Sequence, residues 1–370
     1  MPRCLCLAGL VVAAAVTRVP ARAAADDDEL IGGKPVSRWL QILQDGDQKA
    51  ADRRKALLAL TIAGPKTPGV LAAFTQALRK DADADVRQGA ARALGQMGAA
   101  AKEAATPLTK ALRADQADAV REAAASALGR LAPEARSALP ALTAALKDRH
   151  APTRAAAAET LGRFGPEARP ALTALLQTLK DPDHLVRECA AYALGRLGPE
   201  ARAAVPKLAD VIGRDPQPAV RRAAVEAIAR FGADASSALG PLVKALKDAQ
   251  ADVRRAAAHT LDRLGPDARP AIPALIAALQ DDDKFVRGNA IHAIGHIGKD
   301  GLGADGAKAV LALAACLKDV VTEVRYDAAE ELGDFGPQAK AALPQLRAAL
   351  NDTSPAVRRA AAAAIKRIEP

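Results

Sequence analysis

Residues 161–172 read LGRFGPEARPAL, a segment that joins a glycine–proline pair to an acid, two arginines and a second proline. Near-copies occur at four other places: LGRLAPEARSAL from Leu128, LGRLGPEARAAV from Leu194, LDRLGPDARPAI from Leu261 and LGDFGPQAKAAL from Leu332. A catalytic motif rarely recurs in this way, whereas repeat architectures have a fixed period of about 20 to 50 residues. The segment therefore indicates a structural repeat rather than a reaction.

A recurring arginine sets the register of this repeat. It occurs as Arg53, Arg87, Arg121, Arg154, Arg187, Arg221, Arg254, Arg287, Arg325 and Arg358. Successive arginines are 33 or 34 residues apart, except for a gap of 38 before Arg325. Ten units of this length fill the chain from residue 32 onwards and leave no room for a separate domain. The expected units are roughly 32–64, 65–98, 99–131, 132–164, 165–198, 199–231, 232–264, 265–297, 298–335 and 336–370.

Each unit contains two apolar stretches with helical spacing. In the fifth unit these are ALTALLQTLK at residues 171–180 and HLVRECAAYALGRLG at residues 184–198, and in both the apolar residues fall on one helical face. The turn DPD at residues 181–183 supplies a capping side chain and a proline for a helix start. Gly198 and Pro199 supply a helix end. Because a hairpin of about 30 residues cannot bury its apolar surface alone, the units must stack.

The composition agrees with closely packed helices. Half of the residues are hydrophobic but only 2% are aromatic, so the core consists of small side chains, which disfavours a β-sandwich. Six glycines occupy the same interior position of the second helix, where each costs about 1 kcal/mol relative to alanine. We expect close approach of neighbouring helices to require them, and a shallow floor for a ligand is the alternative. They are Gly95, Gly129, Gly162, Gly195, Gly295 and Gly333.

The segment DPQPAVRRAAVEAIARFG at residues 215–232 joins an Asp-containing turn to an arginine- and alanine-rich helix. Together with the proline-containing first helix, this pattern resembles the HEAT repeat, in the short form also found in phycobilisome lyase subunits. The resemblance covers residues 26–370 and implies an all-α, right-handed solenoid of about ten helical hairpins, an armadillo/HEAT-like superhelix. For function it implies a binding scaffold, with an accessory subunit of bilin-lyase type as an alternative.

The N-terminus resembles an export signal. Arg3 precedes 13 apolar residues, and small residues follow in ARAAA, which is the pattern of a cleaved secretory segment. We expect residues 1–25 to be a signal peptide cleaved near Ala23 or Ala25, and a retained membrane anchor is the alternative. The apolar run is shorter than the roughly 20 residues that span a bilayer. The expected location is secreted or periplasmic, with no stable membrane span after signal removal.

Two arginine series flank the buried face of the second helix on opposite sides. We expect the arginine that sets the register to pair with a turn aspartate of its own or the next hairpin, the candidates being Asp85, Asp118, Asp183, Asp252 and Asp283. The alternative is that it belongs to a ladder that binds an anionic polymer. The second series has no equally regular partner and is either a binding ladder or a solvated face. It comprises Arg130, Arg163, Arg196, Arg230 and Arg263.

Positions that vary between units are not required for stacking, so they are candidates for binding. Two such positions lie two and six residues after the residue that precedes the recurring arginine, such as Val186. Measured from that residue, they lie about 200° and 240° around the second helix and point away from the core. We expect them to face the concave surface that solenoids use for partners. We expect units five to nine to carry the main contact surface. The candidate partner-binding residues are Glu159, Arg163, Tyr192, Arg196, Glu226, Arg230, His259, Arg263, His292, His296, Tyr326 and Glu330.

The histidines raise the question of a metal site. His292 and His296 are four residues apart, and His259 occupies the matching place one unit earlier. The spacing of about 10 Å between adjacent helices is long for a shared ion, and we do not expect Asp262 to be aimed at them. HEAT-like hydroxylases hold two irons with His–Glu pairs, but none of the five histidines in this chain is followed by glutamate. We therefore predict solvated histidines, no metal and no cofactor.

Other site classes find little support. The formal net charge of +9 falls to +6 when Arg3, Arg18 and Arg22 are removed with the signal, and so few aromatic residues offer little for base stacking. We therefore expect no nucleic-acid partner and no small-molecule substrate. The insertion GKDGLGADGAKA at residues 298–309 lacks the pattern of a calcium or phosphate loop. It is either a surface loop or a partner contact.

The remaining special residues are structural. Cys189 and Cys316 lie four units apart, about 40 Å, which excludes a disulfide within one chain. Trp39, the only tryptophan, is expected to cap the exposed end of the core. The sequence thus predicts an exported, monomeric, non-enzymatic scaffold for a protein partner of unknown identity.

Overall fold

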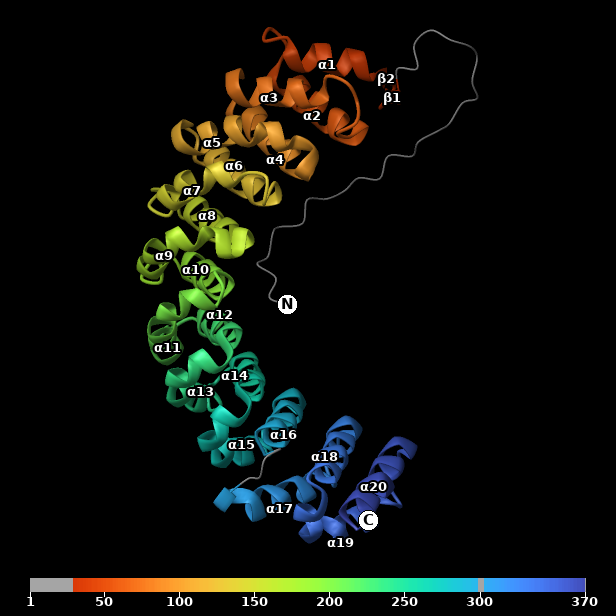
Figure 1. The fold of residues 1–370 in the computed structure, drawn as a ribbon. Coiled ribbons are helices and arrows are strands. Elements are labelled where there is room, and N and C mark those ends of the chain that lie inside the picture. The colour runs from red at the N-terminus through yellow and green to blue at the C-terminus, as the bar shows by residue number, and fades with distance from the viewer. Residues whose placement is uncertain (1–28, 299–302, 370) are drawn as a thin grey trace. The chain divides into compact units, whose positions relative to one another are not determined.

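The computed structural model describes residues 29–298 and 303–369 (Figure 1). The predicted signal peptide at residues 1–25 and part of the glycine-rich insertion lie outside the described residues. The chain divides into two compact units, residues 1–193 and 194–370, which are described separately. Among the described residues no helix is both long and apolar enough to cross a membrane.

The first unit begins with a short antiparallel hairpin and continues as paired helices. Its strands are β1 (Leu30–Ile31) and β2 (Lys34–Pro35). Its α-helices are α1 (Val36–Gln44), α2 (Ala50–Ala63), α3 (Val70–Lys80), α4 (Ala84–Gln96), α5 (Ala105–Ala114), α6 (Asp118–Arg130), α7 (Leu139–Ala145), α8 (Ala151–Phe164), α9 (Leu172–Thr178) and α10 (His184–Arg196), whose last residues belong to the second unit. Its 3₁₀ segments are η1 (Gly98–Ala104), η2 (Arg136–Ala138) and η3 (Gly165–Ala171).

The second unit continues the same alternation. Its α-helices are α11 (Val205–Arg214), α12 (Pro218–Ile228), α13 (Leu239–Ala245), α14 (Ala251–Leu264), α15 (Ile272–Ala278), α16 (Lys284–Gly298), α17 (Gly306–Cys316), α18 (Thr322–Asp334), α19 (Leu343–Ala349) and α20 (Pro355–Ile368). Its 3₁₀ segments are η4 (Pro199–Ala204), η5 (Ala229–Ala238), η6 (Gly265–Ala271), η7 (Gly303–Asp305) and η8 (Gly336–Ala342).

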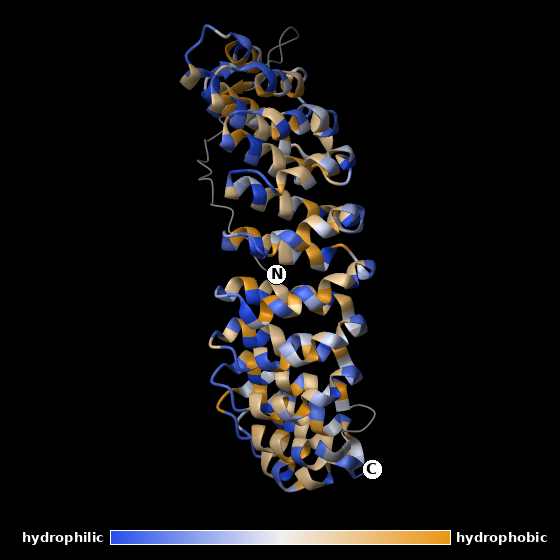
Figure 2. Cartoon of the chain, turned by 90° about the vertical axis from the view of Figure 1, so that its left-hand side faces the viewer, coloured by the Kyte–Doolittle hydropathy of each residue, from blue (hydrophilic) through white to orange (hydrophobic). Residues whose placement is uncertain are grey.

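Within each unit the helices form two layers. Even-numbered helices pack on one another in sequence, as in α4–α6–α8 and α12–α14–α16–α18–α20, and each also packs on the odd-numbered helix that precedes it (Figure 1). Figure 2 shows hydrophilic residues gathered in the turns and hydrophobic residues along the helices. This arrangement is the predicted α-solenoid of helical hairpins, because every hairpin buries its apolar faces against its neighbours.

The first arm of a hairpin is less regular than the sequence suggested. The sequence predicts a helix over 171–180 that tolerates Pro170 in its first turn, but the structure places Pro170 inside η3 and begins α9 at Leu172. Gly165 starts η3 with φ 60°, a left-handed value that glycine adopts without strain. The tighter 3₁₀ turns then lead the chain from one helix into the next.

The recurring glycine of the second helix serves close packing, as predicted. A Cβ on Gly95 would lie 2.8 Å from Ala127 Cα, and one on Gly333 would lie 2.9 Å from Ala364 Cα. These distances are shorter than any real contact between carbon atoms, so the backbones of neighbouring even-numbered helices nearly touch. The cost of glycine inside a helix is offset by this approach.

The recurring arginine links successive turns. At eight of its ten positions the guanidinium forms two bonds to one aspartate, with Nε–Oδ2 distances of 2.6–2.8 Å. The pairs are Arg53–Asp81, Arg87–Asp115, Arg121–Asp148 and Arg154–Asp181 in the first unit, and Arg221–Asp248, Arg254–Asp281, Arg287–Asp319 and Arg325–Asp352 in the second. The third nitrogen, Nη1, donates to a carbonyl of the arginine's own turn, as from Arg154 to Asp148 O at 2.9 Å. The structural role predicted for this arginine is confirmed.

Four of the five aspartates named as its partners were wrong, the exception being Asp118, which does contact Arg121. The true partner is the first acid of the next turn, whose carboxylate also accepts a backbone N–H two residues later, as Asp181 does from Asp183. Asp183 and Asp283 instead cap α10 and α16 by accepting from the N–H groups of Val186 and Val286. Among the other candidates, Asp118 contacts Arg121 as an additional acceptor at 2.7 Å. The last two, Asp85 and Asp252, bind the neighbouring arginines Arg54 and Arg255.

A small cap covers the N-terminal end of the first unit. Trp39 is 8% exposed, and its Nε1 donates to the carbonyl of Ile31 at 2.8 Å. The Lys34 ammonium lies 4.7 Å from the centre of the indole ring. Gly32 and Gly33 both have positive φ in the tight turn between the strands. The capping role of Trp39 was predicted, whereas the strands that complete the cap were not.

Neither described cysteine forms a disulfide, and both are buried, Cys189 in α10 and Cys316 in α17. Burial, together with Asp319, raises the pKa of the Cys316 thiol to about 11. The thiol is therefore protonated at neutral pH and acts as a small apolar side chain, as predicted.

Candidate functional site

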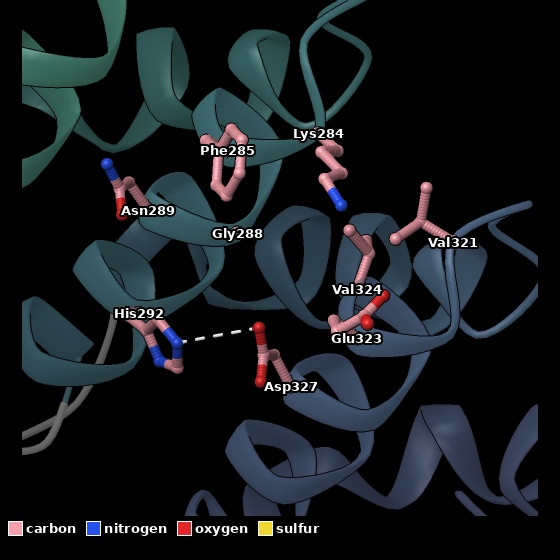
Figure 3. Close-up of a pocket in the computed structure, with 9 residues that line it drawn as sticks. All are labelled: Lys284, Phe285, Gly288, Asn289, His292, Val321, Glu323, Val324 and Asp327. Atoms are coloured by element: carbon pink, nitrogen blue, oxygen red, sulfur yellow. Dashed lines mark ion pairs between the residues drawn. The ribbon is translucent and has the colours of Figure 1, made fainter.

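A surface pocket of about 290 Å³ lies between α16 and α18 of the second unit (Figure 3). A second hollow of about 280 Å³ adjoins it along α18, and the two share Glu323 and Asp327. We call the pocket and the hollow together the α16–α18 groove. The pocket is lined by Lys284, Phe285, Gly288, Asn289, His292, Val321, Glu323, Val324 and Asp327. The hollow is lined by Thr322, Glu323, Tyr326, Asp327 and Ala356.

The pocket opens where α16 has a glycine; most other units have a long side chain at this position, and one has Ala155. Gly288 lies two residues after the buried Val286. The matching residues elsewhere include Glu122, Glu188, Arg222, Arg255, Tyr326 and Arg359. A Cβ on Gly288 would meet only Asp327 Oδ2, at 3.7 Å, so nothing in the packing requires glycine there. The sequence interpretation missed Gly288 because it considered which side chains the variable positions carry, and not which one lacks a side chain.

Exposed apolar side chains gather around the groove. Phe285 is 55% exposed and Tyr326 is 39% exposed, and Val320, next to the lining residue Val321, is 91% exposed. The Phe285 ring is also flanked by two cations, with Arg255 at 4.8 Å and Lys284 at 5.1 Å from its centre. Large apolar groups that stay exposed beside a pocket are typical of a docking surface.

His292 is held by two carboxylates of α18. Its Nδ1 lies 3.0 Å from Glu331 Oε1 and its Nε2 lies 3.5 Å from Asp327 Oδ2 (Figure 3). Asp327 and then Glu331 raise the pKa of His292 to about 10 against the opposing effect of burial. The side chain is therefore an imidazolium at neutral pH, which is a poor metal ligand and a poor general base. It contributes a fixed positive charge to the wall of the groove.

Glu331 departs from the repeat. Its position is occupied by alanine or threonine in the other units, as in Ala127 and Thr160. Gly295 makes room for it, because a Cβ there would overlap the Glu331 carboxylate. At this joint the usual contact between two backbones is replaced by a carboxylate paired with an imidazolium.

The other histidine of α16 points to a different neighbour. His296 Nδ1 lies 2.6 Å from Asp262 Oδ1 of α14, so the expectation that Asp262 is not aimed at the histidines was wrong. His292 contacts α18 whereas His296 contacts α14, and the two imidazoles therefore do not converge. In residues 29–298 and 303–369 no three His, Cys, Asp or Glu side chains are grouped as metal ligands. His259 is exposed on α14.

The remaining predicted residues do not form one site. In the first unit, Glu159 and Arg163 pair on α8 at 2.7 Å, and Tyr192 is half-buried on α10. In the second unit, Glu226 pairs with Arg222 on α12 at 3.9 Å. Of the twelve candidates, His292 and Tyr326 line the groove, and Glu330 lies one helical turn beyond Tyr326 on α18. The other second-unit candidates are half-buried or exposed: Arg196, Arg230 and Arg263.

Comparisons with known proteins agree with the architecture. The chain matches the family described as HEAT repeats at residues 36–129, 105–178, 139–229, 172–261, 205–295, 241–322 and 310–370. No curated protein matches the sequence.

Three solved structures show the same fold. An engineered protein is 22% identical with a TM-score of 0.61, and the alignment covers 90% of this chain and 99% of that one. Importin beta is 16% identical with a TM-score of 0.61 over 90% of this chain and 51% of its own. The Escherichia coli protein YibA is 21% identical with a TM-score of 0.52 over 78% of this chain and 98% of its own. Because the family matches run through nearly the whole described chain, this protein belongs to the HEAT-repeat family.

Proposed function

We propose that this protein is a non-enzymatic scaffold that binds another protein along its even-numbered helices, with the α16–α18 groove as the anchor of the interface. HEAT-repeat solenoids commonly serve as protein-interaction scaffolds and are typically non-enzymatic. The single observation that carries the proposal is the pocket of about 290 Å³ opened by Gly288 beside the exposed ring of Phe285.

The shape and chemistry of the groove suit a macromolecular partner. Interfaces draw most of their binding energy from a few large side chains that enter pockets near the centre of the contact. Here the pocket is open to solvent, with apolar walls from Phe285, Val321 and Val324 and charged groups among its lining residues. A partner side chain that enters it would lose water from both surfaces, and the surrounding charges would set its orientation.

The electrostatics favour binding over proton transfer. General acid–base catalysis needs a group whose pKa lies near the working pH. The one groove residue with a strongly shifted pKa is His292, and its value of about 10 keeps the imidazole protonated through the physiological range. A permanently protonated His292 acts instead as a fixed positive charge that holds the Asp327 and Glu331 carboxylates in place.

We also propose that this protein is exported from the cytoplasm. The basic start at Arg3, the 13-residue apolar run and the small residues before the acids at 26–28 support a secretory signal. We place the partner outside the cytoplasm on that basis.

A capture experiment with a matched control tests the scaffold function. The chain, immobilised after expression with its natural leader, is exposed to an envelope extract of its source and the retained proteins are identified by mass spectrometry. The groove variant is Phe285→Ala with Tyr326→Ala. The control is Leu311→Ala with Leu350→Ala, which removes side chains of comparable exposure, 52% and 39%, from the odd-numbered layer.

We expect one protein to be retained by the wild type and the control and lost from the groove variant. Circular dichroism confirms that all three proteins are folded. Retention of nothing by the wild type, or equal retention by the groove variant, contradicts the proposal.

A further inference from the structure

We propose that the first unit carries a separate docking surface, which binds a partner protein segment that combines an apolar side chain with acidic residues. The surface consists of Leu58 and Ile62 on α2, Arg92 on α4 and Arg130 on α6, and we call it the α2–α6 surface. It shares no residue with the α16–α18 groove, so it goes beyond the function proposed for that site.

The four side chains lie in matching rows on neighbouring helices. Leu58 and Arg92 each come five residues after a recurring arginine, and Ile62 and Arg130 each come nine residues after one. All four are exposed. Helix α4 packs on both α2 and α6, and the axes of packed helices lie about 8–10 Å apart. The four side chains therefore share one face of the even-numbered layer, within about 20 Å.

The α2 end of the surface is apolar. Leu58 is 70% exposed and Ile62 is 64% exposed, and residues four apart lie side by side on one face of a helix. Stacking does not require them, because the matching positions of the next two units carry Arg92 and Arg130. Two adjacent aliphatic side chains that stay in water favour a partner that covers them.

The rest of the surface carries positive charge. Neither Arg92 nor Arg130 forms an ion pair with a residue that the structure describes. A Cβ on Gly95 would lie 3.5 Å from Arg130 Cδ, so the stem of Arg130 lies across α4 at Gly95. Arg92 precedes Gly95 by three residues, and residues at that spacing are neighbours on a helix. The two arginine side chains therefore lie next to each other on α4.

The acids of these helices do not neutralise the two arginines. Three of them are already paired: Asp52 with Lys55, Asp85 with Arg54 and Glu159 with Arg163. Glu122 occupies the position from which Arg54 and Arg255 reach forward to the following even-numbered helix, which for α6 is α8 and not α4. Glu134 lies in the turn after α6, at the position where Glu167 pairs with an arginine of the preceding turn. Arg92 and Arg130 thus remain available to an acidic partner.

Desolvation determines which partner fits. A segment that covers the surface removes water from two guanidinium groups, and an unpaired buried charge is strongly unfavourable. Carboxylates offset this cost through charge-assisted hydrogen bonds, whereas a basic or wholly apolar segment does not. A polyanion without apolar groups pairs with the arginines but leaves Leu58 and Ile62 in water. An acidic segment with an apolar side chain satisfies both parts of the surface.

The helix spacing sets the spacing within the partner. One step of about 8–10 Å between helices corresponds to about three residues of extended chain. An apolar residue placed over α2 should therefore be accompanied by acids about three and about six residues away, over α4 and α6.

Selection from random peptides tests this chemistry. Phage-displayed peptides of about 12 residues, which extend over roughly 40 Å, are selected on the full chain carrying Phe285→Ala and Tyr326→Ala, so that binders of the α16–α18 groove are not enriched. The peptides are synthesised with a fluorescent label, together with copies in which their acids are replaced by amides. Anisotropy then gives the affinity of each peptide for the wild type and for three variants.

Two variants alter the surface and one is a matched control. The first is Arg92→Gln with Arg130→Gln, and the second is Leu58→Ala with Ile62→Ala. The control, Arg79→Gln with Arg113→Gln, removes two charges from exposed sites on the odd-numbered helices α3 and α5. Circular dichroism confirms that all the proteins are folded.

We expect the enriched peptides to contain an apolar residue and at least two acids at about the predicted spacing. Loss of both arginines should weaken binding at least about tenfold, as for loss of a charge-assisted hydrogen bond. The Leu58→Ala, Ile62→Ala variant should also weaken it, the control should not, and the amide copies should bind weakly to every protein. Enriched peptides without acids, no enrichment, equal weakening in the control, or unchanged binding to the Leu58→Ala, Ile62→Ala variant would overturn the proposal.

Three probes identify other occupants. Polyphosphate or vesicles containing phosphatidylglycerol that bind more tightly than the peptides, and lose binding when the two arginines are replaced, would show that the surface serves a polyanion or a lipid. The chain's own acids at 26–28 are tested by replacing Asp26, Asp27 and Asp28 with asparagine. A higher peptide affinity in that variant would show that the surface binds its own chain, and each of these results contradicts the proposal. Unchanged affinity supports a partner protein.

The outcome is separable from that of the scaffold proposal, because the peptides are selected on a chain whose α16–α18 groove is altered. If envelope capture depends on Phe285 and Tyr326 but no acidic peptide is enriched, the groove function stands and the α2–α6 surface is wrong. If acidic peptides bind the α2–α6 surface but envelope capture fails, the opposite holds.

Discussion

Replacing Gly95 with alanine tests whether the helix backbones of the even-numbered layer touch. A Cβ at this position would lie 2.8 Å from Ala127 Cα and 2.9 Å from Ala127 Cβ. Both are parts of a neighbouring helix that cannot move aside as a flexible side chain can. Overpacking of this kind costs about 1–3 kcal/mol, whereas alanine in a helix gains about 1 kcal/mol over glycine. We therefore expect Gly95→Ala to lower the free energy of unfolding by up to about 2 kcal/mol.

Gly213 provides the matched control. It is exposed in the last turn of α11, and a Cβ there would meet nothing within 4 Å. Gly213→Ala should therefore raise stability slightly, by roughly 0.5 kcal/mol. Urea unfolding followed by circular dichroism measures both variants, and an unchanged dependence on urea shows that the same transition is compared. Equal or greater stability of Gly95→Ala relative to Gly213→Ala would refute the close-approach argument.

Three further predictions concern charged contacts. Arg254→Met should destabilise the chain by about 3–5 kcal/mol because Asp281 stays buried without its partner, and Arg254→Met with Asp281→Leu should recover part of that loss in urea unfolding. Because the folded-state pKa of His292, about 10, is above its ordinary 6.5, its stabilising effect is complete below about pH 6.5 and disappears as the pH rises to about 10. The stability difference between wild type and His292→Gln should shrink over that range, and a constant difference would contradict the pairing. Since Glu331 and His292 compensate each other, the double variant His292→Ala with Glu331→Ala should be more stable than the sum of the single variants predicts, and additive effects would show that the two side chains do not interact.

Most of the fold follows from the sequence because stacking requires the same residues in every unit. The period, the helical hairpins, the role of the glycines and the structural role of the recurring arginine were all predictable. The choice of aspartate was not, since each turn contains several acids and the one that pairs depends on backbone N–H groups that hold it, as Asp183 N–H holds Asp181. The strands β1 and β2 have two residues each, too few for an alternating pattern to be recognised.

The candidate site could be predicted only in part. Variation at outward-facing positions selected His292 and Tyr326 correctly as surface residues, but their setting depends on contacts between helices. The pairing of His292 with Glu331 and of His296 with Asp262 requires the lateral alignment of three helices. The gap of 38 residues before Arg325 hides the alignment of α16 with α18 in the sequence. Glu331 occupies a position that is buried alanine or threonine elsewhere, so it lay outside the outward-facing positions considered as candidates.

The groove combines two departures from the repeat that differ in their consequences for stability. Gly288 affects stacking little, because a Cβ there would meet no backbone and an alanine would fit. Glu331 places a carboxylate where every other unit packs a small neutral side chain, and it is tolerated because Gly295 gives it space and His292 supplies the opposite charge. Two residues, His292 and Glu331, thus differ together beside the recurring Gly295, at a joint that an alanine would form more simply. Stacking alone does not account for that combination. A surface that needs an open pocket beside an organised pair of carboxylates does account for it, and this is why the α16–α18 joint is where the partner is expected to bind.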